Sequence, residues 1–121
     1  MTTSIQGRIL HHGTTRQRAE AILRDGPNPN FKEPGGFELA HGFSTAPPEG
    51  PFPVGSPEDY ARKKAVNFPA EGGPAIVEIE VPEEIVQQAS DTGGEIRFSL
   101  RNGLEELLTA WPTIPKRILQ P

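Results

Sequence analysis

The chain has 121 residues and a formal net charge of −4, which suits one domain over residues 1–121 and disfavours non-specific binding to nucleic acid. It contains no cysteine, so it has neither disulfides nor a cysteine-based zinc site. The N-terminus lacks an apolar signal region, and no apolar run approaches the roughly 20 residues of a membrane span. We therefore expect a cytoplasmic monomer without membrane contacts, or a protein that is exported by a route that needs no N-terminal signal.

The first half of the chain predicts two strand–helix units separated by loops. The 13 glycines and 14 prolines exceed average usage and predict short elements with long connections. Residues 8–12 form a strand that stops at Gly13, and Thr14 or Thr15 then caps a helix that ends at Gly26. A loop over 26–41 leads to a strand over 42–46. A second Pro-rich loop over 47–57 ends where Ser56 or Pro57 begins another helix.

The second half predicts three strands and one clear helix. In residues 75–81, apolar residues alternate with Glu78 and Glu80, so one face of this strand is buried and the other is wet. Residues 82–89 form a helical turn, 95–100 a second alternating strand, 104–111 a helix with a leucine stripe, and 114–119 an edge strand. This order predicts an α+β fold: a curved, mostly antiparallel sheet, split in two, with helices on one side.

Three segments combine polar residues with unusual local geometry. In the first, strand alternation places His11 and His12 on opposite faces, so only one of them enters a given cleft. Gly13 lets a ligand approach the backbone, and the following helix N-terminus favours carboxamide or phosphate oxygens. The alternative is a pair of surface or capping histidines.

The other two segments offer an aromatic pair and a carboxylate. Phe43 and Tyr60 could enclose a flat ring, or both could be core residues. Gly93 and Gly94 deliver Glu95 to the first position of a strand, on the face opposite its core residues. The alternative for Glu95 is an ordinary solvated carboxylate at a sheet edge.

Taken in chain order, these segments resemble the signature of a known superfamily. The chain is similar to the ADP-ribosyltransferases of the diphtheria-toxin and poly(ADP-ribose)-polymerase branch, whose signature places His, Tyr and Glu on three separate strands. The family's first motif is His-Gly-Ser/Thr followed by a helix, and here it selects His12 rather than His11. The matching stretches are Ile9–Thr14 with Ala19, Ile22 and Gly26, then residues 42–46 with Tyr60, then residues 95–98.

The resemblance implies a split, mostly antiparallel β-sandwich with flanking helices that uses NAD as co-substrate and no metal. Glu95 would stabilise the positive charge that develops on the ribose, and His12 would bind a ribose hydroxyl. Glu105 and Glu106 remain alternative candidates for the catalytic carboxylate. Arg16, Arg18 and Arg62 are the candidates for neutralising the pyrophosphate. The cofactor-binding set implied is His12, Gly13, Thr14, Phe43, Ser44 and Tyr60.

One position departs from the family pattern. Ser44 stands where the motif carries the tyrosine that stacks on nicotinamide. The main hypothesis is a mono-ADP-ribosyltransferase or NAD glycohydrolase, with an unidentified macromolecule, small molecule or water as acceptor. Two alternatives are an NAD-dependent RNA 2′-phosphotransferase and a non-catalytic module that binds a partner through the Pro-rich loops over residues 27–57.

Overall fold

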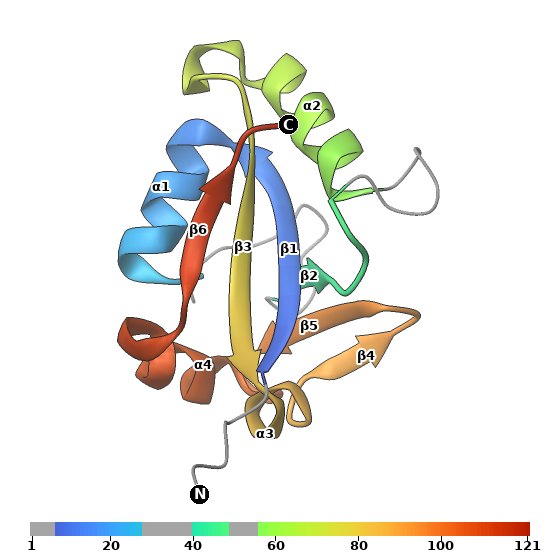
Figure 1. The fold of residues 1–121 in the computed structure, drawn as a ribbon, viewed down its shortest axis with the longest axis vertical. Coiled ribbons are helices and arrows are strands. Elements are labelled where there is room, and N and C mark those ends of the chain that lie inside the picture. Colours follow the sequence, from blue (N-terminus) through green and yellow to red (C-terminus); the bar gives the residue numbers. More distant parts are fainter. Residues whose placement is uncertain (1–6, 28–39, 49–55) are drawn as a thin grey trace, which may run out of the picture.

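The computed structural model describes residues 7–27, 40–48 and 56–121 and contains one six-stranded sheet. The strand order is β4-β5-β2-β1-β3-β6, and every strand pair is antiparallel (Figure 1). The strands are β1 (Gly7–Thr15), β2 (Ala40–Ser44), β3 (Pro74–Pro82), β4 (Ser90–Thr92), β5 (Glu95–Ser99) and β6 (Lys116–Leu119). The predicted α+β class is therefore confirmed. The predicted sandwich is not, because the described strands form one hydrogen-bonded sheet.

Four α-helices and two short 3₁₀ turns accompany the sheet in the described residues. They are α1 (Arg16–Asp25), α2 (Pro57–Asn67), η1 (Pro69–Glu71), α3 (Glu83–Val86), α4 (Leu104–Ala110) and η2 (Trp111–Thr113). The helix starts follow the predicted capping residues. Thr15 Oγ1 accepts from the Arg18 amide at 3.3 Å and Ser56 Oγ from the Asp59 amide at 3.1 Å. Gly26 ends α1 with φ +80°, a backbone conformation that favours glycine.

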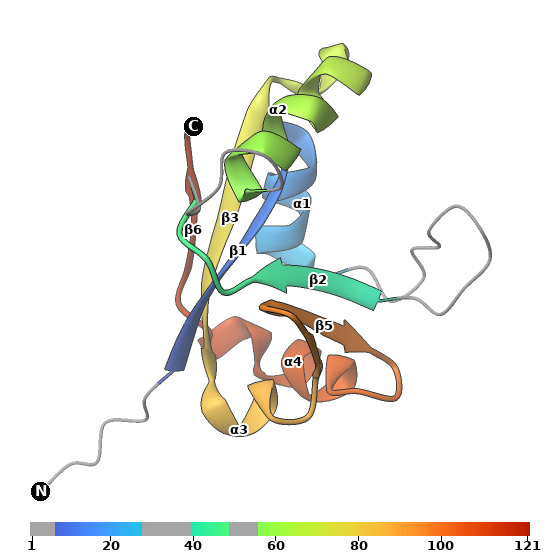
Figure 2. The ribbon, with the colours of Figure 1, turned by 90° about the vertical axis from the view of Figure 1, so that its right-hand side faces the viewer.

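The two sides of β1 pair very differently. Every residue of β1 has a partner in β3, from Gly7–Pro82 to Thr15–Pro74. The prediction that this strand stops at Gly13 is wrong, because the long pairing with β3 carries it on to Thr15. On its other side, β1 pairs with β2 only through His11 and Ser44. Strands β2, β4 and β5 run steeply across the direction of β1 and β3 (Figure 1, Figure 2), which explains this single pair.

The main core lies on one face of the sheet. Leu10, Val77 and Ile79 of the long strands meet Phe43 and Phe98 of the short ones. Ala19 of α1 and Leu104 and Leu107 of α4 complete this cluster. Buried Trp111 donates its indole N–H to the Leu23 carbonyl at 3.0 Å and so joins η2 to α1. One continuous core therefore supports both parts of the sheet.

Helix α2 covers the opposite face, where the sequence predicted no helix. Gly13 and Ile76 are paired and share that face, and a Cβ atom at Gly13 would overlap the Pro57 carbonyl oxygen of α2. Ile76 and Ala61 are both buried but lie outside the main cluster. The prediction of helices on one side is therefore wrong. Gly13, which was predicted to stop the strand, instead allows α2 to pack closely against it.

Candidate functional site

A cleft of about 660 Å³ lies between α2 and the strands β1, β2 and β5, at the point where β2 diverges from β1. Its volume falls within the roughly 300–1,000 Å³ of small-molecule sites. Five of the predicted site residues line it: His12, Gly13, Ser44, Tyr60 and Glu95. The remaining lining residues are His11, Gly42, Thr45, Ala46, Pro57, Lys63, Lys64, Asn67, Thr92, Gly93 and Gly94. Residues of β1, of β2 and the segment after it, of α2, and of the β4–β5 turn therefore meet at one hollow.

A row of polar residues crosses the sheet through this cleft. Directly opposed residues in antiparallel strands project from the same face. From β6 to β4 the row consists of Arg117, Glu78, His11, Ser44, Glu95 and Thr92. Ser44 thus lies between His11 and Glu95, on the face that α2 covers further along the strands. The members from His11 to Thr92 line the cleft.

Gly42 connects His12 with Glu95. Its carbonyl oxygen accepts from His12 Nδ1 at 2.8 Å. A carbonyl only accepts, so the neutral imidazole carries its proton on Nδ1, and Nε2 is then an acceptor. A Cβ atom at Gly42 would overlap the carboxylate of Glu95, so the side chain of Glu95 lies directly over this glycine. Both predicted catalytic residues therefore contact the same residue of β2.

Glu95 is accessible from the cleft, with 51% of its side chain exposed. Arg97 lies two residues further along β5, and its Nε is 3.3 Å from Glu95 Oε1. On the strand pair, Ser44 is directly opposite Glu95 and Gly42 is opposite Arg97. The neighbouring Gly93–Gly94 turn, where both residues have positive φ, reverses the chain immediately before Glu95. The carboxylate thus lies at a fixed strand start beside the hollow.

Helix α2 forms the opposite wall of the cleft. Tyr60, Lys63, Lys64 and Asn67 line the cleft at a spacing of i, i+3, i+4 and i+7, the spacing of one helix face. Tyr60 is 59% exposed, which leaves its ring accessible. The two lysines are not among the predicted site residues, although their helical spacing from Tyr60 is a signal that the sequence contains.

The three arginines considered for the pyrophosphate do not line the cleft. Arg18 Nε donates to Glu71 at 2.7 Å, and its guanidinium lies over the Phe68 ring. Arg16 forms an ion pair with Glu20 and Arg62 forms one with Glu58, in each case four residues away on the same helix. Lys63 and Lys64 are therefore the basic residues that reach the cleft among the described residues.

Two predicted cofactor-binding residues have their side chains in the interior instead. Thr14 and Phe43 are each 2% exposed and are not among the residues that line the cleft. Phe43 packs edge-on against Phe98, with ring centroids 6.0 Å apart, and lies 5.3 Å from the His12 ring. Phe43 is therefore a core aromatic residue, which was the alternative considered for it. From the core, its ring packs against the ring of His12.

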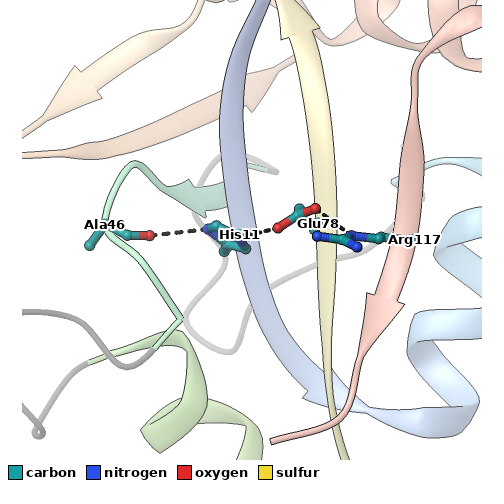
Figure 3. Close-up of polar contacts among 4 residues, drawn as sticks. All are labelled: His11, Ala46, Glu78 and Arg117. Atoms are coloured by element: carbon teal, nitrogen blue, oxygen red, sulfur yellow. Dashed lines mark hydrogen bonds and ion pairs between the residues drawn. The ribbon is translucent and has the colours of Figure 1, made fainter.

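His11 also lines the cleft, so the prediction that only one histidine enters it is wrong. His11 is 6% exposed, and its two ring nitrogens face Glu78 Oε2 at 2.9 Å and the Ala46 carbonyl at 3.1 Å (Figure 3). Glu78 Oε1 in turn accepts from Arg117 Nε at 2.6 Å. The hydrogen bond from Arg117 is the main cause of a lowered pKa of Glu78. Partial burial of Glu78 raises this pKa, and the contact with His11 lowers it further. Sequence reasoning favoured His12 because that residue precedes Gly13.

The competing carboxylates lie elsewhere. Glu105 and Glu106 are exposed on α4 and do not line the cleft. Among the described residues, no helix combines the length and apolar character needed to cross a membrane. Comparison of the chain with protein-family models, with curated proteins and with solved structures gives no match in any of the three. The case for a function therefore depends on the cleft itself.

Proposed function

We propose that this protein is an NAD-dependent ADP-ribosyltransferase, or an NAD glycohydrolase where water is the acceptor. The observation that supports it most is the convergence of His12, Ser44, Tyr60 and Glu95 from separate elements on one cleft. The sequence motifs alone predict the same four residues for this chemistry. The link through Gly42 between His12 and Glu95 adds geometric support.

The reaction requires a fixed negative charge near the sugar. The bond between the nicotinamide nitrogen and the ribose carbon breaks, and its electron pair leaves with neutral nicotinamide. The nucleophile then bonds to that carbon and loses its proton. Positive charge develops on the ribose in between, so the accessible carboxylate of Glu95 stabilises the transition state and orients the nucleophile.

The other cleft residues have complementary tasks. His12 lines the cleft and is the residue proposed to bind a ribose hydroxyl, and its hydrogen bond from Nδ1 to the Gly42 carbonyl fixes the orientation of the ring. The ring of Tyr60 can cover one face of nicotinamide. Lys63 and Lys64 supply positive charge for the diphosphate, although Lys63 also pairs with Asp59 at 2.9 Å. Ser44 offers a small side chain where the family motif has an aromatic ring.

The decisive experiment compares two glutamate variants. The full chain is incubated with NAD, and released nicotinamide is measured by chromatography. Glu95→Gln should lower the rate by about 10²–10³, the usual effect of removing a preorganised electrostatic group. Its thermal stability should stay close to that of wild type, because about half of the Glu95 side chain is exposed and the amide of glutamine keeps its size.

Glu105→Gln is the matched control, since Glu105 is an exposed carboxylate outside the cleft. It should release nicotinamide at the wild-type rate. Wild-type activity in Glu95→Gln would refute the catalytic role of Glu95. Binding of NAD without cleavage by the wild-type chain would refute transfer and favour a binding module, and titration calorimetry distinguishes these results.

A further inference from the structure

His11 joins the two parts of the sheet at their only described pairing point. It lies in β1 opposite Ser44 of β2 on one side and Glu78 of β3 on the other. Its ring contacts Glu78 and the Ala46 carbonyl, two groups on either side of the strand (Figure 3). The ring therefore connects the long strands to the segment that follows β2.

The protonation state of His11 follows from what its nitrogens face. A carbonyl oxygen accepts hydrogen bonds and cannot donate them, and the same is true of an ionised carboxylate. Glu78 is ionised over the neutral pH range, since Arg117 holds its pKa below the usual carboxyl value. Both contacts are therefore hydrogen bonds only when both ring nitrogens carry protons. An imidazolium can form both of these hydrogen bonds, whereas a neutral imidazole can form only one of them.

The segment that His11 holds is a wall of the cleft. Residues 45–48 follow β2, and Thr45 and Ala46 line the hollow. The Thr45 amide donates to the Gly94 carbonyl at 2.9 Å, next to Glu95. The Pro48 carbonyl accepts from the Glu58 amide in the first turn of α2, also at 2.9 Å. The contact between His11 and Ala46 lies between these two attachments.

We propose that His11 is a positioning residue: its imidazolium, held between Glu78 and Ala46, fixes residues 45–48 against the cleft and makes that wall sensitive to pH. The inference depends on the proposed function only for the identity of the ligand. A neutral ring keeps its single proton on Nε2, where the carboxylate forms the stronger, charge-assisted bond. The bare Nδ1 then faces the Ala46 carbonyl, and the two acceptors repel each other.

Raising the pH should weaken the attachment of residues 45–48 to the cleft. The ordered wall contains one bound proton that the loosened wall lacks, so raising the pH favours loosening. Among the side chains, imidazole is the one whose charge ordinarily changes closest to neutral pH, so a histidine is the residue type that can give such an effect. On the neighbouring elements, Glu78 of β3 contacts His11 and Arg117 of β6 contacts Glu78. The charged residues that line the same cleft are Glu95 of β5 and Lys63 and Lys64 of α2.

Hydrogen exchange tests the proposal without a ligand. Exchange of the Thr45 and Ala46 amides is measured at pH 6 and pH 8 and corrected for the intrinsic rate. Protection in the wild-type chain should fall about tenfold at pH 8, the effect of one hydrogen bond. His11→Gln, which has no titrating group, should show equal protection at both pH values. Glu80→Gln, a carboxylate two residues from Glu78 on β3, should behave like wild type.

The result that overturns the proposal is equal wild-type protection at both pH values, or the same fall in His11→Gln. Nitrogen-15 shifts of the wild-type His11 ring give a second measurement that needs no variant. They should report two protonated nitrogens at pH 6 and a proton on Nε2 alone at pH 8. A proton on Nδ1 at pH 8 would contradict the proposed release of Ala46.

Titration with NAD then distinguishes this role from the proposed function. Wild-type affinity should weaken about tenfold from pH 6 to pH 8, following the loss of one hydrogen bond, and His11→Gln should show no such change. If NAD does not bind at either pH, the proposed function fails. The exchange experiment still decides the role of His11, because it contains no NAD.

Discussion

The two sides of β1 differ in how the protein uses them. Towards β3, the strand is paired along its whole length and its core-facing residues are buried. Towards β2, one residue pair remains, and the space opened by the diverging strand becomes the cleft. Backbone groups that leave the ladder are available to other partners, as the Gly42 carbonyl is to His12. Regular pairing supports stability here, and its interruption provides the site.

A substitution in the shorter part of the sheet tests whether the two parts fold together. Phe98 in β5 is fully buried and belongs to the same core cluster as Leu10 and Val77. Phe98→Ala should lower the free energy of unfolding by about 3–5 kcal/mol, the usual cost of removing a buried phenyl ring. Urea denaturation followed by circular dichroism should still show one transition.

The matched control is Leu100→Ala, just beyond the end of β5, where the side chain is 64% exposed. It should change the free energy of unfolding by less than about 0.5 kcal/mol. Two separate transitions in Phe98→Ala would show that β2, β4 and β5 unfold independently. The contrast between the two sides of β1 would then be a boundary between folding units.

A smaller loss of stability is expected at the seat of α2. In Gly13→Ala, the added methyl group would overlap the Pro57 carbonyl and lie 2.8 Å from the Ala61 amide nitrogen, so α2 has to move. We expect the free energy of unfolding to fall by about 1–3 kcal/mol. Under the proposed function, affinity for NAD should also weaken, because Tyr60 moves with the helix. Chemical denaturation and titration calorimetry measure the two effects.

Gly7→Ala serves as the control on the same strand. There the closest atom is Cγ of the Glu80 side chain, at 2.6 Å, and this side chain can rearrange. Its effect on the free energy of unfolding should stay below about 1 kcal/mol. Equal losses in the two variants would mean that the backbone of α2 is not the obstacle at Gly13.

The smallest expected effect concerns the polar row at the β6 edge. Arg117 is the main cause of the lowered pKa of Glu78, so this carboxylate adds stability above the unfolded-state pKa of about 4.3. That contribution is lost as the pH falls through the lower, folded-state pKa. Arg117→Gln should cost less than about 1 kcal/mol at pH 7, because Arg117 is largely exposed.

The difference in free energy of unfolding between Arg117→Gln and wild type should shrink as the pH falls below the pKa of Glu78. Urea denaturation at several pH values measures this difference. Arg24→Gln is the control, since its ion pair with Asp25 is exposed on both sides and should leave the pH dependence unchanged. A gap between Arg117→Gln and wild type that persists at low pH would exclude an ionised Glu78 as its cause.

Periodicity and capping residues predicted most of the fold. The alternation over residues 75–81 and the caps at Thr15 and Ser56 match the structure because burial and local hydrogen bonds determine them. Strand β4 was missed because its three residues are all exposed and polar. The position of α2 was missed for another reason. From the local sequence, Gly13 predicts the end of a strand. That α2 packs against this glycine is a property of the tertiary structure alone.

The residues that line the cleft were partly predictable for similar reasons. His12 and Glu95 could be chosen from glycine-flanked strand ends, which are local features. The role of His11 depends on Glu78 and Arg117, two residues far along the chain that become its neighbours through strand register. Register across three strands is a long-range property, so a single sequence does not reveal the row. Phe43 was predicted to contact the ligand, because an aromatic side chain can equally well pack in a hydrophobic core or stack on a ligand ring.

The chain contains one tryptophan and one tyrosine, and they lie in different regions. Trp111 is buried where η2 meets α1, whereas Tyr60 is exposed at the hollow. Indole emission therefore reports on the folded interior, and phenol absorbance reports on what occupies the site. The natural protein thus carries two separate optical reporters, and a ligand can be observed independently of unfolding without any added label.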